Sequence, residues 1–175
     1  IPNSLPVATA TFKTSVSTTA DIGAPPSLYV FNASSLAKPH ALQQLQADLT
    51  GYAIDIAIIS ETHFKKKHID SAVSINDYNL ARRDREGRRG GGVAAYVHKD
   101  IRFFVLLFAA DQPDFELPWL NLNGTFGNFI IGAIYHPPKP KYATIDFLNY
   151  LDNCISDIFL NFPTSIIVVA GDVNT

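Results

Sequence analysis

Residues 165–174 read Ser-Ile-Ile-Val-Val-Ala-Gly-Asp-Val-Asn, and the rest of the chain is best understood from them. Four consecutive aliphatic residues, at 166–169, are too few for a helix and too uniformly apolar for a half-exposed strand. They predict a strand that is buried on both faces in the middle of a sheet. Gly171 then frees the backbone to turn, and Asp172 and Asn174 are expected to project to the same side of an extended segment. A carboxylate and an amide should therefore meet at the end of a core strand.

Two other apolar runs also end in polar side chains. Residues 54–60 read Ile-Asp-Ile-Ala-Ile-Ile-Ser and lead to Glu61, and a shorter run leads to Asn32. Because open sheets bind ligands just beyond the ends of their strands, Asn32, Glu61 and the Asp172/Asn174 pair are predicted to form one polar site. Their oxygen atoms suit a hard cation such as Mg²⁺, with Mn²⁺ as a second choice.

The composition limits the class of protein. A chain of 175 residues with 47% hydrophobic content favours a single domain. A net charge of −2 and a pI near 6.2 mean that any affinity for DNA must come from a local basic patch. The single cysteine, Cys154, permits no internal disulfide and no zinc cluster, which fits a reducing compartment. The sequence contains neither a secretion signal nor an apolar run of membrane-spanning length, so we expect no secretion and no membrane partner.

The first part of the chain differs from the rest. Residues 1–26 are rich in Ser, Thr, Ala and Pro and carry almost no charge, and they are predicted to be a disordered linker before a domain at residues 27–175. The chain starts at Ile1 and contains no methionine, so we expect it to be a piece of a longer polyprotein.

The segments between these motifs suggest an α/β arrangement. Helices are predicted from Pro39 to Gly51 and from Thr144 to just before Pro163, because apolar residues recur there with a helical period. Further strands are expected at residues 78–81, 93–97, 101–108, 119–122 and 128–135. The strands at 93–97, 101–108 and 119–122 are expected to form a meander.

One concentrated basic feature stands out at residues 82–89. It contains five arginines, Arg82, Arg83, Arg85, Arg88 and Arg89, and a run of three glycines follows it. Two interpretations are open: a solvated flexible loop, or a contact in which guanidinium groups bind DNA phosphates. The lysines at 65–67 are read as a solvated loop.

Five motifs in this order resemble the endonuclease domain of non-LTR retrotransposons, which belongs to the endonuclease/exonuclease/phosphatase superfamily together with apurinic endonucleases and deoxyribonuclease I. They are Leu-Tyr-Val-Phe-Asn at 28–32, Ile-Ile-Ser-Glu-Thr at 58–62, Arg-Arg-Asp-Arg with Gly-Gly-Gly-Val-Ala at 82–94, Ile-Tyr-His-Pro-Pro at 134–138, and Ala-Gly-Asp-Val-Asn at 170–174.

The resemblance implies a two-sheet α/β sandwich of the deoxyribonuclease I type. It implies a magnesium-dependent endonuclease that nicks duplex DNA and leaves a 3′-hydroxyl primer for reverse transcription. Its partners would be target DNA and, through a downstream reverse transcriptase, the element's RNA, in the nucleus after synthesis in the cytoplasm. The fold is expected to be incomplete at the C-terminus, because the family's later Ser-Asp-His motif does not occur in these residues.

The resemblance also implies roles for single residues. Glu61 would be the principal metal ligand, and Asn32 would help to position metal or phosphate. Asp172 would orient or deprotonate the attacking water, while Asn174 and Tyr135 would contact the scissile phosphate. Glu116 resembles a family glutamate near the site but is left out of the catalytic set.

Two other functions compete with this one. The first is a phosphatase or phosphodiesterase with the same fold and another phosphoester as substrate. The second is a catalytically inactive fragment that binds DNA or a protein partner. His63 and His136 are assigned no role, since a solitary histidine more often packs or caps.

Overall fold

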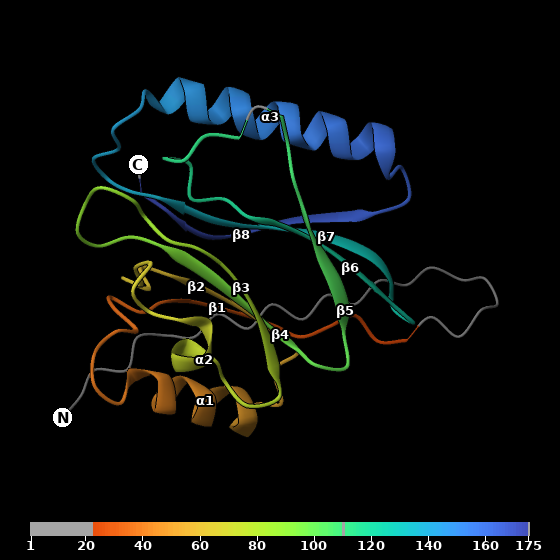
Figure 1. Cartoon of the computed structure of the whole chain (residues 1–175). Coiled ribbons are helices and arrows are strands. Elements are labelled where there is room, and N and C mark those ends of the chain that lie inside the picture. The colour runs from red at the N-terminus through yellow and green to blue at the C-terminus, as the bar shows by residue number, and fades with distance from the viewer. Residues whose placement is uncertain (1–22, 110, 175) are drawn as a thin grey trace.

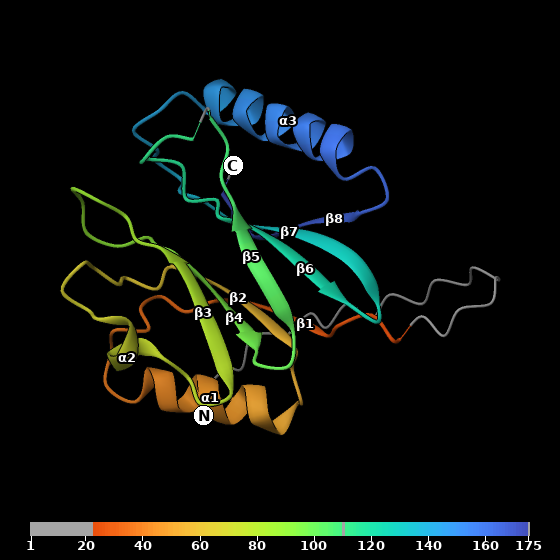
Figure 2. The ribbon, with the colours of Figure 1, turned by 45° about the vertical axis from the view of Figure 1, so that its right-hand side comes forward.

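The computed structural model describes residues 23–109 and 111–174, so most of the predicted linker lies outside the described residues. Two four-stranded sheets pack face to face. One long helix lies on the outer side of each sheet, α1 on the first and α3 on the second (Figures 1 and 2). Among the described residues, no helix combines the length and the apolar character of a membrane span.

The first sheet has the order β1-β2-β4-β3. Its strands are β1 (Leu28–Asn32), β2 (Ile56–Ser60), β3 (Tyr78–Arg83) and β4 (Val93–His98). Helix α1 (Ala41–Gly51) makes the crossover that leaves β1 and β2 parallel, whereas β4 runs antiparallel to both β2 and β3. Asn32 pairs with Ser60 in this register, so the residue after β2, Glu61, begins next to Asn32.

The second sheet has the order β5-β6-β7-β8. Its strands are β5 (Arg102–Leu106), β6 (Trp119–Gly124), β7 (Gly127–His136) and β8 (Ile166–Val173). The first three form an antiparallel meander, and helix α3 (Thr144–Asn161) returns the chain so that β8 lies parallel to β7. In that register Tyr135 lies opposite Asp172.

Alternating side chains divide the core into three layers, because successive residues of a strand point to opposite faces. In β2, Ile56 and Ile58 pack between the two sheets, whereas Ala57 and Ile59 pack toward α1. On the second sheet, Trp119 lies in the layer under α3. The two-sheet α/β sandwich predicted from the sequence is therefore confirmed.

The position of β8 corrects one prediction. We expected this strand in the middle of a sheet, buried on both faces, but among the described residues it pairs only with β7 and forms the edge of the second sheet. Ile166 and Val169 are 48% and 40% exposed. An aliphatic run indicates a preference for burial, but it does not specify how many strands lie beside it.

The predicted meander was also wrong in its first member. Strand β4 belongs to the first sheet, and the chain crosses to the second sheet through a turn in which the amide of Ile101 donates to the carbonyl oxygen of His98. Both helices begin near the predicted positions, α1 after His40 and α3 after Ala143, although neither has a side-chain cap. The four-residue helix α2 (Asp70–Val73) was not predicted.

Candidate active site

Asn32 joins side chains from both sheets. Its Nδ2 donates to Oε1 of Glu61 at 3.1 Å and to Oδ2 of Asp172 at 2.7 Å. The amide is oriented by the backbone N–H of Ser34, which donates to Asn32 Oδ1 at 3.0 Å. The structure therefore brings together three of the polar side chains that the sequence placed after β1 and β2 and near the end of β8.

Tyr135 adds a phenol to this group. Its hydroxyl donates to Glu61 Oε1 at 3.1 Å. Burial and then the nearby Glu61 carboxylate raise the pKa of Tyr135 to about 12. The phenol is therefore protonated at neutral pH, as the hydrogen bond requires.

The backbone around Glu61 has an unusual conformation. Glu61 and His63 both lie in the left-handed region, with φ of 52° and 58°. Three backbone hydrogen bonds hold this segment. The Ser35 amide donates to the carbonyl oxygen of Glu61 at 2.8 Å. The amides of Thr62 and His63 donate to the carbonyl oxygens of Gly92 and Gly91, at 3.1 and 2.8 Å. Strained backbone of this kind persists where the surrounding structure fixes it, and such sites are often functional.

Asn174 has a different hydrogen-bond partner from Asn32. Its Nδ2 and its backbone amide both donate to the carbonyl oxygen of His136, at 3.0 and 3.1 Å. The described contacts therefore tie Asn174 to the end of β7 rather than to Asn32. The His136 ring stacks on Phe147 at a centroid distance of 5.2 Å, and burial lowers the pKa of His136, so this histidine belongs to the aromatic packing.

The five predicted DNA-binding arginines have different surroundings. Three have carboxylate partners: Arg82 binds Asp70 at 2.9 Å, Arg83 binds Asp111 at 2.6 Å, and Arg85 binds Glu116 at 2.5 Å. Arg88 donates to the backbone oxygen of Lys139 at 3.3 and 3.2 Å, and Arg89 is exposed. The basic segment therefore combines three arginines paired with carboxylates, Arg88 bound to a backbone oxygen, and the exposed Arg89.

Glu116 is part of the same network, although sequence reasoning left it out. It is only 2% exposed, and it accepts hydrogen bonds from Arg85 Nε and from the backbone amide of Gly92. Burial raises the pKa of Glu116, while the bond from Gly92 and the charge of Arg85 oppose that rise. A sequence signal existed: the carboxylate stands in Phe-Glu-Leu-Pro-Trp, among apolar residues, and a buried carboxylate needs a partner.

The carboxylate oxygens around Asn32 are suitable ligands for a hard cation. The described residues contain no group of three or more His, Cys, Asp or Glu side chains that could hold a metal. However, Mg²⁺ keeps several water ligands and is often bound through only one or two carboxylates. Glu61 and Asp172 supply two, and their oxygens converge on one amide nitrogen. These two residues would hold the ion, with Asn32 beside it.

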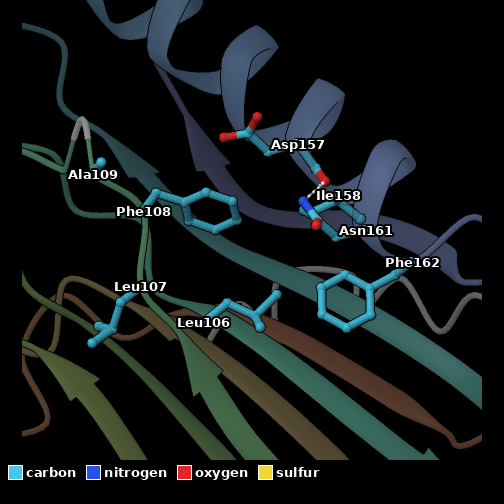
Figure 3. A pocket seen from close by; sticks show the side chains of 8 residues that line it. All are labelled: Leu106, Leu107, Phe108, Ala109, Asp157, Ile158, Asn161 and Phe162. Carbon is cyan, nitrogen blue, oxygen red and sulfur yellow. Dashed lines mark hydrogen bonds between the residues drawn. The ribbon is translucent and has the colours of Figure 1, made fainter.

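A separate pocket has a different lining from this polar site. It has a volume of about 190 Å³ and lies between the end of β5 and the last turns of α3 (Figure 3). Six of its eight lining residues are apolar, and Asp157 is its one titratable residue. Asn161 Nδ2 donates to the backbone oxygen of Asp157 at 2.8 Å. We assign the chemistry to the Asn32 site instead.

The fold and the polar site at its strand ends define a class. The model of the endonuclease/exonuclease/phosphatase family matches residues 27–175, and the chain belongs to this family. This confirms the superfamily inferred from the five motifs. No curated protein sequence matches the chain closely enough to count as a relative.

Solved structures show the same fold at low sequence identity. The endonuclease domain of TRAS1, a telomere-specific non-LTR retrotransposon, has a TM-score of 0.61 and 16% identity over 86% of this chain and 62% of that chain. The 2′,3′-cyclic phosphatase ANGEL2 has a TM-score of 0.63 and 16% identity over 86% and 53%. The AP endonuclease LMAP from Leishmania major has a TM-score of 0.57 and 14% identity over 83% and 54%. The chain thus spans about half to three fifths of their lengths.

Proposed function

We propose that this chain is part of a magnesium-dependent endonuclease of a non-LTR retrotransposon, which nicks duplex DNA and leaves a 3′-hydroxyl for reverse transcription. The observation that carries the proposal is the convergence of Glu61 and Asp172 on Asn32 from two sheets. The order of the five sequence motifs and the fold similarity to the TRAS1 endonuclease domain favour DNA as the substrate. The element's RNA, a downstream reverse transcriptase and a nuclear location belong to the same proposal.

The residues of the site divide the chemistry of phosphodiester hydrolysis. Magnesium, when bound, would neutralise charge on the phosphate and stabilise the leaving oxygen. Glu61 and Asp172 would hold the ion, and Asp172 would also orient the attacking water and accept its proton. The phenol of Tyr135 donates its one proton to Glu61 in this structure and would transfer that hydrogen bond to a phosphate oxygen when substrate binds. Asn174 uses one N–H for His136 and retains a second N–H for the phosphate.

Two arginines at the end of the basic segment would bind the DNA backbone. Arg88 and Arg89 are the members of the segment without a carboxylate partner among the described residues. Guanidinium groups bind phosphate oxygens through paired hydrogen bonds, so these two arginines suit contacts with the backbone that do not depend on sequence.

A plasmid assay tests this function. Residues 1–175 with Mg²⁺ should nick supercoiled plasmid weakly or not at all, because these residues do not contain the family's Ser-Asp-His motif. An extended chain that also carries a Ser-Asp-His segment should nick it and leave ends that a polymerase can extend. Replacing Asp172 with alanine in the extended chain should lower the rate by about 10²–10⁴, the usual effect of removing a general acid or base.

Two results would contradict the proposal. An extended chain that hydrolyses a cyclic phosphate or a phosphomonoester but leaves plasmid intact would be a phosphatase. An extended chain that binds DNA and hydrolyses none of these substrates would be a binding module.

A further inference from the structure

We infer that Arg85 and Glu116 are positioning residues, which hold Tyr135 and, through it, Glu61, and that Arg85 is not a DNA contact. The inference rests on the proposed active site. It separates Arg85 from the other arginines of the basic segment and gives a role to Glu116.

The surroundings of Arg85 are those of an internal group. Its side chain is 10% exposed, and its Nε donates to Glu116 Oε1 at 2.5 Å. Its Cζ lies 5.2 Å from the centroid of the Tyr135 ring, within the range of a cation–π contact. A guanidinium that is held on one side by a carboxylate and on another by an aromatic ring has little surface left for a DNA phosphate.

Glu116 links the same ring to the glycine run. Its carboxylate accepts from Arg85 and from the Gly92 amide, while its backbone oxygen accepts from the Tyr135 amide at 2.9 Å. Gly92 in turn accepts from the amide of Thr62, the residue after Glu61. Glu116 therefore contacts the Tyr135 segment directly and the Glu61 segment through Gly92.

Lys65 and Gly91 fix the loop that carries Arg85. Lys65 Nζ donates to the carbonyl oxygens of Arg85, Arg88 and Gly90 at 3.1, 2.7 and 3.4 Å. A Cβ atom on Gly91 would lie 2.3 Å from Arg85 Cζ, so glycine is needed there for the guanidinium to pass. Lys65, which the sequence suggested was solvated, thus fixes the path of the loop backbone. Gly91 leaves room for the Arg85 guanidinium.

These contacts predict an effect on the metal site. Arg85 fixes the plane of the Tyr135 ring, whose hydroxyl lies 3.1 Å from Glu61 Oε1. Partners that orient a metal ligand typically change metal affinity about 10–100-fold when they are removed. Loss of Arg85 should therefore weaken metal binding although Arg85 itself touches no ligand oxygen of Glu61.

The test compares two arginines of the same segment, Arg85→Gln and Arg89→Gln. We expect Arg85→Gln to lower Mn²⁺ affinity about tenfold in calorimetry and to leave the salt dependence of DNA binding, measured in EDTA, unchanged. Arg89→Gln should leave Mn²⁺ affinity unchanged and reduce the slope of log K against log salt by about 0.9, the loss of one phosphate contact. The opposite pattern, with Arg85→Gln reducing the slope and sparing Mn²⁺ affinity, would make Arg85 a DNA contact and overturn the inference.

A second variant covers the case in which Arg85→Gln does not fold. Arg85→Lys keeps a positive charge beside Glu116 but loses the planar guanidinium. It should weaken Mn²⁺ binding in the parent chain and have almost no further effect in Tyr135→Phe, because the connection to Glu61 is already broken there. Independent, additive losses would overturn the inference. Since Mn²⁺ binding is measured without DNA, coupling between Arg85 and Tyr135 would stand even if the nuclease proposal failed.

Discussion

The Asn32 side chain connects the two sheets through hydrogen bonds. Its neutral amide donates to Glu61 and Asp172 at once, and Ser34 fixes the orientation of the amide. A neutral donor lessens the repulsion between two carboxylates but does not cancel their charge. A divalent cation would do so, and the arrangement therefore favours binding one.

The close approach of Gly91 to Arg85 should make a larger side chain at position 91 costly. Gly91 and Gly87 both have positive φ, 65° and 67°, so alanine is strained at either position. A Cβ at 87 would meet only Lys141 Nζ at 3.6 Å, whereas a Cβ at 91 would push Arg85 away from the buried Glu116. Gly91→Ala should therefore lower the free energy of unfolding by about 1–3 kcal/mol more than Gly87→Ala in urea melts. Equal losses would show that the Arg85 position is not tightly packed.

Sequence patterns predicted the polar side chains that converge at the site better than the residues that hold them in place. Asn32 and Glu61 stand at the ends of apolar runs, which made their convergence predictable from strand geometry. The pair between Arg85 and Glu116 joins residues 31 positions apart in irregular segments, and no periodicity connects them. Their ion pair depends on how the two sheets pack, so it required the structure.

The pairing of β8 with β7 delivers Asp172 to the site. This pairing depends on Gly171, which lies opposite Ile134 and has φ of 144°. A Cβ there would lie 1.9 Å from the backbone oxygen of Ile134, and a strand backbone cannot move aside as a side chain can. The glycine read in the sequence as freeing the backbone to turn in fact lies within the strand and permits close strand contact.

Replacing Gly171 with alanine tests this element. We expect Gly171→Ala to cost about 2–4 kcal/mol of unfolding free energy, from backbone strain and overpacking together. Gly51→Ala is the matched control, because a Cβ at the end of α1 meets nothing within 4 Å; it should be neutral or stabilise by about 0.5–1 kcal/mol. Thermal and urea unfolding of both variants would decide, and a Gly171→Ala chain as stable as the parent would contradict the close pairing.

The sequence patterns located the strands but not their neighbours in the sheets. Apolar, β-branched and aromatic runs bounded by turn residues located all eight strands of the described residues. They did not reveal which sheet β4 would join or that β8 would lie at an edge. Those features depend on contacts between segments distant in sequence, which local patterns do not record.

The whole molecule is a four-layer arrangement in which the two sheets meet at one polar edge. Strands β1 and β2 bring Asn32 and Glu61 from one sheet, and β7 and β8 bring Tyr135 and Asp172 from the other. The apolar layer between the sheets thus fixes the distance between the two carboxylates. A shared metal site would be a property of sheet packing rather than of any one motif.

A calorimetric titration with Mn²⁺ of the parent chain, Glu61→Gln, Asp172→Asn and the double variant tests this claim most directly. We expect one ion per chain, a loss of at least about tenfold in affinity for each single variant, and no measurable binding in the double variant, since each change makes a charged ligand neutral. Glu86→Gln, which changes an exposed carboxylate paired with Lys66, is the control and should bind as the parent does. Parent-like Mn²⁺ affinity in both Glu61→Gln and Asp172→Asn would show that the two carboxylates do not share an ion and would contradict the account.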